Sequence, residues 1–167
     1  MSHEYTYDIS MFRDTFETRF TYLNGFLRNV SRFGSRPALF DPRSGRRWTY
    51  RELNAEANRL AHALRADGVG KNDVVMFTLL NSPEFVFCYL AAHKIGAVAC
   101  PVNYRQGAGE IALVIDDSTP KAFIYDAEFG ELSGGALDLC ESKPAIKIVV
   151  YFNISPPVFE KKNPTST

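Results

Sequence analysis

Long apolar runs, an excess of charge of one sign and paired cysteines are all missing from this chain. No apolar run in its 167 residues approaches the roughly 20 residues that a helix needs to cross a bilayer, so we expect no transmembrane segment. The polar, acidic start, Met1 to Ser10, predicts neither a signal peptide nor a transit peptide. Nineteen basic residues balance nineteen acidic ones, and we therefore expect no nucleic-acid partner and no anionic-membrane partner.

Cysteine and histidine are scarce and scattered. The three cysteines are Cys88, Cys100 and Cys140. An odd number of cysteines, two of them within apolar stretches where a free thiol behaves as a small hydrophobe, favours a reduced, cytoplasmic setting. The three histidines show no ligand spacing with one another or with cysteine, so we expect no metal site there. They are His3, His62 and His93.

The usual phosphate-binding and nucleophile motifs are also missing. There is no G-x-x-x-x-G-K-[ST] loop and no G-x-S-x-G turn. Gly68-Val69-Gly70 precedes a predicted strand, whereas a dinucleotide fingerprint must follow one. Gly107-Ala108-Gly109 follows a strand but lacks the third glycine, and Gly134-Gly135 lies in a predicted helix or loop. All three are therefore interpreted as turns.

Three further groups of residues have ordinary structural interpretations. The basic residues Arg43, Arg46 and Arg47 flank a Ser44-Gly45 turn, and a solvated turn is expected rather than a phosphate site. Asp116-Asp117 could bind a metal, but this pair more simply ends a helix. Cys100 has no histidine near it in the sequence to activate it, so we do not expect a catalytic cysteine.

The first part of the chain predicts helices and a hairpin. Apolar residues at steps of three and four predict a helix over 12–32. Two short strands, at 37–40 and 47–49, flank a turn and predict a hairpin. A helix over 49–66 follows, with Thr49 and Glu52 forming a capping box at its start.

From residue 73 onwards, apolar strands alternate with helices. Strands are predicted at 73–80, 97–102, 122–125 and 145–152, and helices at 82–96, 109–117 and 129–141, the last interrupted by Gly134-Gly135. This alternation predicts a layered α/β fold with a mostly parallel sheet and flanking helices. We expect residues 1–152 to form one partial domain. Residues 153–167 are polar and aperiodic, and a disordered tail is expected there.

Four short blocks of sequence are not specific individually, but their combined order and spacing are informative. They are Trp48 to Leu53 (W-T-Y-R-E-L), Ser82 to Phe85 (S-P-E-F), Lys94 to Arg105 (K-I-G-A-V-A-C-P-V-N-Y-R) and Ile115 to Ser118 (I-D-D-S). The order and spacing resemble the start of the adenylate-forming enzymes, the AMP-dependent synthetases and ligases, and among them the acyl-CoA synthetases. The resemblance implies that residues 1–152 are the first subdomain of a partial AMP-binding (adenylation) domain.

The resemblance also implies a reaction for the whole enzyme. Such enzymes use ATP, Mg and coenzyme A to convert an acid, here a fatty or aryl acid, into an acyl-adenylate and then a thioester. They hold ATP with a Ser/Thr/Gly-rich loop ending in Pro-Lys-Gly, which the 167 residues do not contain. We therefore expect an N-terminal fragment that is inactive alone and binds no cofactor, and we assign no catalytic, cofactor-binding or metal-binding residue to it.

Several alternatives stay open from the sequence. Five phenylalanines could line an acyl channel, although at helical spacing packing is the ordinary role: Phe12, Phe16, Phe20, Phe26 and Phe33. The chain could also be a stand-alone binding or regulatory module that pairs with a full-length ligase, or a small nucleotide-binding protein of flavodoxin type. The expected partner is the remainder of the ligase domain or a full-length ligase. A face left uncovered would favour self-association.

Overall fold

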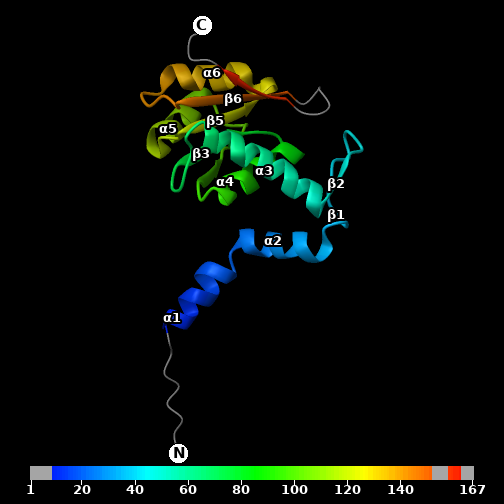
Figure 1. Cartoon of the computed structure of the whole chain (residues 1–167). Coiled ribbons are helices and arrows are strands. Elements are labelled where there is room, and N and C mark those ends of the chain that lie inside the picture. The colour runs from blue at the N-terminus through cyan, green and yellow to red at the C-terminus, as the bar shows by residue number, and fades with distance from the viewer. Residues whose placement is uncertain (1–8, 152–157, 163–167) are drawn as a thin grey trace, which may run out of the picture.

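The computed structural model describes residues 9–151 and 158–162, which form a five-stranded sheet covered by helices and a separate two-stranded hairpin (Figure 1). The strand order is β4-β3-β5-β6-β7; the first three pairings, among β4, β3, β5 and β6, are parallel, and β7 is antiparallel to β6. This confirms the mostly parallel α/β sheet. The strands are β3 (Val74–Thr78), β4 (Val98–Pro101), β5 (Ala122–Asp126), β6 (Ile146–Tyr151) and β7 (Val158–Lys162).

Each face of the sheet has its own helices and its own core. Alternate residues of a strand point to opposite faces, so Val75 and Phe77 pack with helices α3 and α4, while Met76 packs with α5 and α6. Among the described residues, no helix is both long and apolar enough to cross a membrane. The helices are α3 (Tyr50–Ala66), α4 (Pro83–Lys94), α5 (Ala108–Ser118), the short η2 (Ala127–Phe129) and α6 (Gly130–Leu139).

The hairpin joins the first helices to the sheet. Strands β1 (Pro37–Phe40) and β2 (Arg47–Thr49) pair antiparallel, and Trp48 places its ring 5.8 Å from that of Phe87 in α4. The capping box at the start of α3 is confirmed: the Glu52 N–H donates to Thr49 Oγ1 (3.2 Å), and the Thr49 N–H donates to Glu52 Oε2 (2.8 Å). These bonds fix the point at which the hairpin ends and the helix begins.

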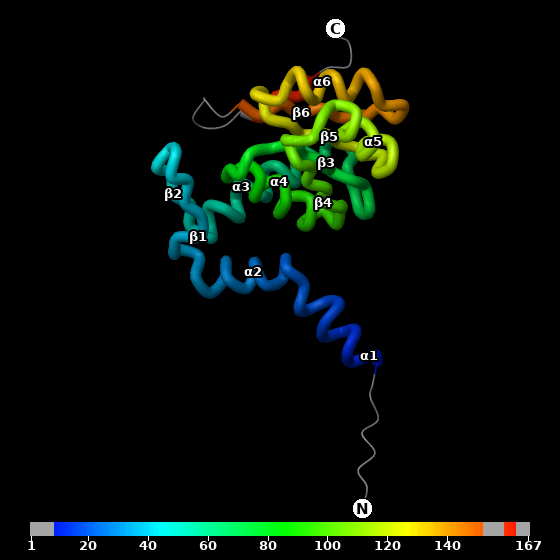
Figure 2. The backbone as a smooth tube through the Cα atoms, turned by 180° about the vertical axis from the view of Figure 1, so that it is seen from behind, coloured from blue at the N-terminus to red at the C-terminus, as the bar shows by residue number. Residues whose placement is uncertain are grey.

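The helix predicted over 12–32 is interrupted in the structure. Helix α1 (Ile9–Phe12) runs into the π-helix η1 (Arg13–Arg19), and α2 (Tyr22–Phe33) starts afresh after Thr21. Thr21 has extended backbone, and its hydroxyl accepts the N–H of Asn24 (3.2 Å), which caps a new helix and breaks the old one. Residues 9–19, the N-terminal arm, project from the body in both views (Figures 1 and 2).

Two other expectations differ from the structure. Helix α6 continues through Gly134-Gly135, and Gly135 lies against α5, where an added Cβ would be 3.4 Å from the Ala108 Cβ. The disordered tail was expected over 153–167, but residues 158–162 form β7, since the edge of β6 offers backbone partners from Lys147 to Tyr151. Residues 153–157 and 163–167 of that tail lie outside the described residues.

Replacing Gly96 or Gly134 with alanine should change the free energy of unfolding in opposite directions. Gly96 ends the α4 segment at φ 73°, and its Cβ would lie 3.3 Å from Lys71 Cγ, whereas a Cβ at Gly134 meets nothing within 4 Å. We expect Gly96→Ala to lower the free energy of unfolding by about 1 kcal/mol or more. Gly134→Ala should raise it by about 0.5–1 kcal/mol, because alanine has the higher helix propensity. Urea unfolding followed by circular dichroism measures both; a gain in Gly96→Ala would contradict the backbone assignment.

Candidate functional site

The carboxyl ends of β3 and β5 lie next to each other at a point where the chain changes direction. From β3 the chain passes through α4 to β4 on one side of β3; from β5 it passes through α6 to β6 on the other side. Parallel sheets bind ligands in the crevice outside the carboxyl ends of their strands at such a switch point. The carboxyl edge of β3 and β5 is therefore the expected position of a ligand-binding site.

Two buried carboxylates belong to this edge. Asp126 is the last residue of β5, and Glu84 lies in the first turn of α4, the helix that follows β3. They are 2% and 4% exposed, and within the described residues Asp126 Oδ2 and Glu84 Oε2 have no hydrogen-bond partner. We call Glu84 and Asp126 the carboxylate pair.

The carboxylate pair lies on one face of the sheet. Ile124 belongs to the core on the α3 and α4 side, and Asp126, two residues later, is directed to the same face as Ile124. Thr78, the end residue of β3, alternates with Phe77 and falls on the opposite face, although its hydroxyl is also buried without a partner. The site is thus made by α4 and β5, with Thr78 behind it.

Desolvation dominates the electrostatics of the pair. Burial raises the pKa of Glu84, against the lowering effect of its own backbone N–H, the Ser82 hydroxyl and Arg46. Burial also raises the pKa of Asp126, although the Glu128 N–H donates to its other oxygen, Oδ1, at 2.9 Å. The negative charge of Glu84 adds a smaller contribution in the same direction, so the two groups act on each other.

The β1–β2 turn brings further charges to this edge. Arg46 acts on Glu84 and Arg43 on Asp126, each lowering the pKa of that carboxyl. Asp41 accepts the N–H of Arg43 (3.0 Å) and the Ser44 hydroxyl (2.7 Å), and the Ser44 bond holds the pKa of Asp41 below its usual range. The Arg46 guanidinium also lies 4.6 Å from the Trp48 ring. The turn that was expected to be merely solvated therefore has defined contacts.

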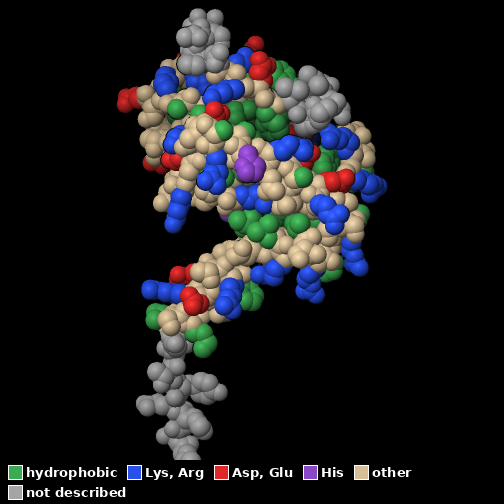
Figure 3. Space-filling view, in the orientation of Figure 1, with side chains coloured by type: hydrophobic (Ala, Val, Ile, Leu, Met, Phe, Trp, Pro, Cys, Tyr) green, Lys and Arg blue, Asp and Glu red, His purple; other side chains and the backbone are tan. Residues whose placement is uncertain are grey.

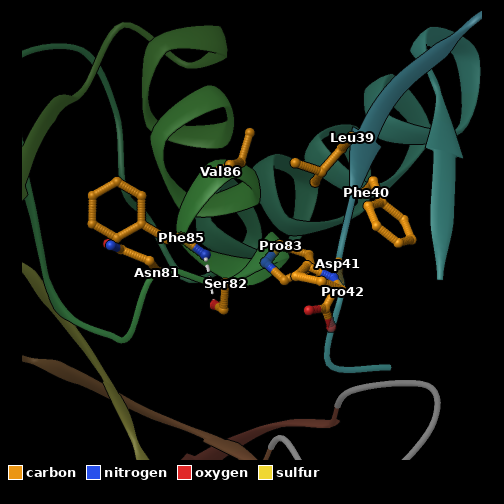
Figure 4. A pocket seen from close by; sticks show the side chains of 9 residues that line it. All are labelled: Leu39, Phe40, Asp41, Pro42, Asn81, Ser82, Pro83, Phe85 and Val86. Atoms are coloured by element: carbon orange, nitrogen blue, oxygen red, sulfur yellow. Dashed lines mark hydrogen bonds between the residues drawn. The ribbon is translucent and has the colours of Figure 1, made fainter. Parts of the chain in front are cut away.

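A pocket of about 290 Å³ opens between the end of β1 and the start of α4 (Figure 4). Its walls are mainly apolar, and its polar groups are Asp41, Asn81 and Ser82. The Ser82 hydroxyl accepts the N–H of Phe85 (3.4 Å) and so caps α4. The lining residues are Leu39, Phe40, Asp41, Pro42, Asn81, Ser82, Pro83, Phe85 and Val86.

The residues weighed from the sequence do not converge on a site. Gly68 is in a turn at φ 88°, and Gly107 is the cap of α5, its N–H donating to Glu110 Oε2 (2.8 Å). Asp116 Oδ1 accepts the N–H of Ser142 (2.7 Å), which ties the end region of α5 to the segment before β6. Within the described part of the chain, no group of three or more His, Cys, Asp or Glu side chains could hold a metal ion.

The cysteines are free thiols in the described residues, and most of the five phenylalanines are not buried. Cys88 and Cys140 are buried and Cys100 is half-buried, all three as free thiols. Burial raises the pKa of the Cys100 thiol, the opposite of what a nucleophile needs. Of the five phenylalanines, only Phe26 is buried, and Phe12, Phe16 and Phe20 are exposed.

The sequence interpretation missed the carboxylate pair as a site. Glu84 was noticed only as part of the S-P-E-F block, and Asp126 was not singled out. The available signal was an acidic residue directly after each of two central apolar strands or their helix caps, since carboxyl ends of parallel strands share one edge. Burial and the lack of partners could not be inferred from that pattern.

Comparison with known proteins identifies the chain. The sequence model described as AMP-binding enzyme matches residues 26–166. The chain belongs to the AMP-binding enzyme family. Over 100 residues, 60% of this chain, it is 43% identical to the 3-hydroxybenzoate–CoA/4-hydroxybenzoate–CoA ligase of Thauera aromatica. Over 90 residues, 54% of this chain, it is 42% identical to the long-chain-fatty-acid–CoA ligase FadD13 of Mycobacterium tuberculosis.

Solved structures of AMP-binding enzymes share the fold. The N-terminal domain of FACL13 from Mycobacterium tuberculosis superposes with a TM-score of 0.68 and 32% identity over 80% of this chain and 34% of that one. The anthranilate CoA ligase AuaEII gives a TM-score of 0.70 and 25% identity over 78% of this chain and 24% of that one. The chain thus corresponds to an N-terminal part of these ligases, and it spans 19% and 18% of the two curated relatives.

The carboxylate pair should make the chain less stable at high pH. A raised folded-state pKa means that the native chain binds more protons than the unfolded chain between the ordinary value, 4.5 for Glu84, and the raised one. The free energy of unfolding therefore falls as pH rises through that window. Glu84→Gln removes the buried charge, so at pH 8 we expect it to raise the free energy of unfolding by about 1–3 kcal/mol.

Urea unfolding at pH 4 and pH 8 measures this effect. The gain of Glu84→Gln should be small at pH 4, where the carboxyl is protonated in both states. Glu131→Gln is the matched control, because Glu131 is an exposed residue at the start of α6 and should change little at either pH. A loss of stability in Glu84→Gln at pH 8 would show instead that the Glu84 carboxylate has hydrogen-bond or ion-pair partners in the folded chain in solution.

Proposed function

We propose that this chain is the N-terminal part of an ATP-dependent acid–CoA ligase, which forms an acyl-adenylate and then an acyl-CoA thioester. The observation that carries the proposal is the family match over residues 26–166 in a chain that covers less than a fifth of its ligase relatives. Those relatives act on aryl and long-chain fatty acids by name, so a fatty or aryl acid is the proposed substrate class. A reduced, cytoplasmic setting is part of the proposal, supported by three free thiols.

We further propose that the chain is inactive alone. The 167 residues contain no Ser/Thr/Gly-rich loop ending in Pro-Lys-Gly. The described carboxyl edge does not fit a nucleotide triphosphate either, because the buried Glu84 and Asp126 carboxylates would repel its phosphates. ATP, Mg and coenzyme A are accordingly assigned to the whole enzyme, and this part supplies scaffold.

Pyrophosphate release and acyl-CoA formation test the proposal. The purified chain, given ATP, Mg, coenzyme A and a panel of benzoates and fatty acids, should show no product above a blank without protein. A chimera in which the matched segment of the Thauera aromatica ligase is replaced by the matched segment of this chain should form acyl-CoA at a reduced but measurable rate. Product formed by the chain alone would overturn the claim of inactivity, and a folded chimera without activity would count against the ligase assignment.

One observation supports the second candidate function, in which the chain is a binding module for a full-length ligase. The N-terminal arm exposes apolar side chains with no cover from the described body, as the space-filling view shows (Figure 3). Phe12, Phe16 and Phe20 form a ladder with ring centroids 4.7 and 5.6 Å apart. We propose that this ladder packs against the remainder of the ligase domain, in the same protein or in a full-length ligase. Stoichiometric co-purification with such a ligase would favour the binding module.

Without that cover, the arm should make the chain self-associate. Phe16 and Phe20 are 53% and 65% exposed, and burying an aromatic side chain is favourable by about 1.5–3 kcal/mol. We expect the weight-average mass of the chain to rise with concentration. The double variant Phe16→Ser, Phe20→Ser should associate at least about tenfold more weakly.

Sedimentation velocity over a wide concentration range measures the association. Leu139→Ser is the matched control, because Leu139 is 64% exposed but lies on α6, away from the arm. Its association should equal that of the unsubstituted chain. A monomer mass at every concentration, with a sharp unfolding transition, would remove the claim that an apolar face is left uncovered.

A further inference from the structure

The buried side chains of Glu84 and Asp126 each carry a carboxylate oxygen that the surrounding residues do not pair. A buried polar group without a hydrogen-bond partner is unfavourable, and a buried unpaired charge is more so. Yet Glu84 Oε2 and Asp126 Oδ2 are both buried, and neither has a hydrogen-bond partner in the part of the chain that the structure describes. In native structures such groups are explained by backbone strain, a catalytic role, or a bound water or ion.

The two carboxylates come from different elements and reach the same place. Glu84 is in the first turn of α4, which leaves β3, and Asp126 ends the neighbouring parallel strand β5. Asp126 shares the sheet face of Ile124, which packs with α3 and α4, and Glu84 lies on α4 itself. Each also has one group that holds it in position: the Glu128 N–H donates to Asp126, and the Ser82 hydroxyl is adjacent to Glu84. Each carboxylate thus has one anchored side and one oxygen without a partner.

Charges of both signs surround the carboxylate pair. Asp41 adds a third negative charge close enough to act on Glu84. Arg43 and Arg46 of the β1–β2 turn act on the pair from outside it, but none of the ion pairs within the described residues includes Glu84 or Asp126. The Arg46 guanidinium is instead stacked on the Trp48 ring.

We propose that Glu84 and Asp126 form a binding site for one nitrogen cation, an ammonium or guanidinium group, at the switch point between β3 and β5. A nitrogen cation brings three or more N–H donors and can satisfy both free oxygens at once. A divalent metal fits less well, because it needs more oxygen ligands than this pair supplies, and no metal-binding cluster occurs among the described residues. The site is a property of this chain, so its test does not depend on ligase activity.

Small cations test the site on the whole chain. The probes are methylguanidinium chloride and ethylammonium chloride, with sodium chloride at equal ionic strength as the reference, since salt alone screens charges. At about a tenfold excess over the dissociation constant, one of the two probes should raise the unfolding temperature by about 3–5 °C. The double variant Glu84→Gln, Asp126→Asn should lose this shift.

A matched variant and a second measurement keep the test decisive. Glu131→Gln, Asp138→Asn removes two exposed carboxylates of α6 and should keep the full shift. Should the Glu84→Gln, Asp126→Asn variant not fold, carbon-13 NMR of the side-chain carboxyls in the unsubstituted chain replaces it. The Glu84 and Asp126 signals should then move with the probe, while those of Glu131 and Asp138 stay in place.

Peptides covering the part of the Thauera aromatica ligase outside the match distinguish two sources of the cation. A shift that depends on one Lys or Arg of one peptide assigns the group to the ligase domain itself. A shift with the small cations alone assigns a free organic cation. No shift with any nitrogen cation overturns the proposal. A shift with magnesium chloride but with neither nitrogen cation also overturns it and makes the pair a metal site.

Discussion

The parallel pairing of β3 with β5 is the constraint on which the rest of the structure depends. Its register, from Val75 opposite Ala122 to Thr78 opposite Tyr125, fixes where both strands end. Because β4 joins β3 on the other side, the helices after β3 and β5 must leave in opposite directions and on opposite faces. The crevice between those two exits follows from topology alone, before any side chain is considered.

Burial has opposite effects on the sheet and on the carboxylate pair: it stabilises the sheet and destabilises the charged forms of Glu84 and Asp126. The sheet is fully buried along β3 and β5 apart from one half-buried residue, Val74, and this burial stabilises the fold. The same dry surroundings disfavour the charged forms of Glu84 and Asp126, whose pKa values are raised by burial. Cores made only for stability avoid such groups, and their presence beside a switch point is typical of a place kept for another group.

Most of the fold could be predicted from local patterns, and the errors have physical causes. The capping box at Thr49 and the apolar strand β3 are each encoded within a few residues, and both predictions are confirmed. At Thr21 the preference of threonine for a helix cap competes with continuation of the apolar helical pattern, and the cap prevails. At Gly134 the low helix propensity of glycine competes with continuation of α6, and the helix prevails. The spacing of apolar residues does not predict either outcome.

The candidate site was harder to predict because it is made by contact between distant segments. The order of the elements places the start of α4 and the end of β5 at one edge of the sheet. Nothing in the sequence places the β1–β2 turn there, although Arg43 and Arg46 of this turn act on the two carboxylates. The family could be predicted from four short blocks, because their order and spacing can be counted along the sequence. Strand β7 was missed because an edge strand is specified by the strand it pairs with more than by its own composition.

The central claim is that this chain is the front part of a ligase rather than a protein with a separate role. The most direct measurement is the coding DNA beyond codon 167, read in all three forward frames. The account predicts a Ser/Thr/Gly-rich segment ending in Pro-Lys-Gly in one of them, followed by further ligase sequence. Its absence from every frame would contradict the claim and leave the chain as a short protein whose exposed arm serves a partner.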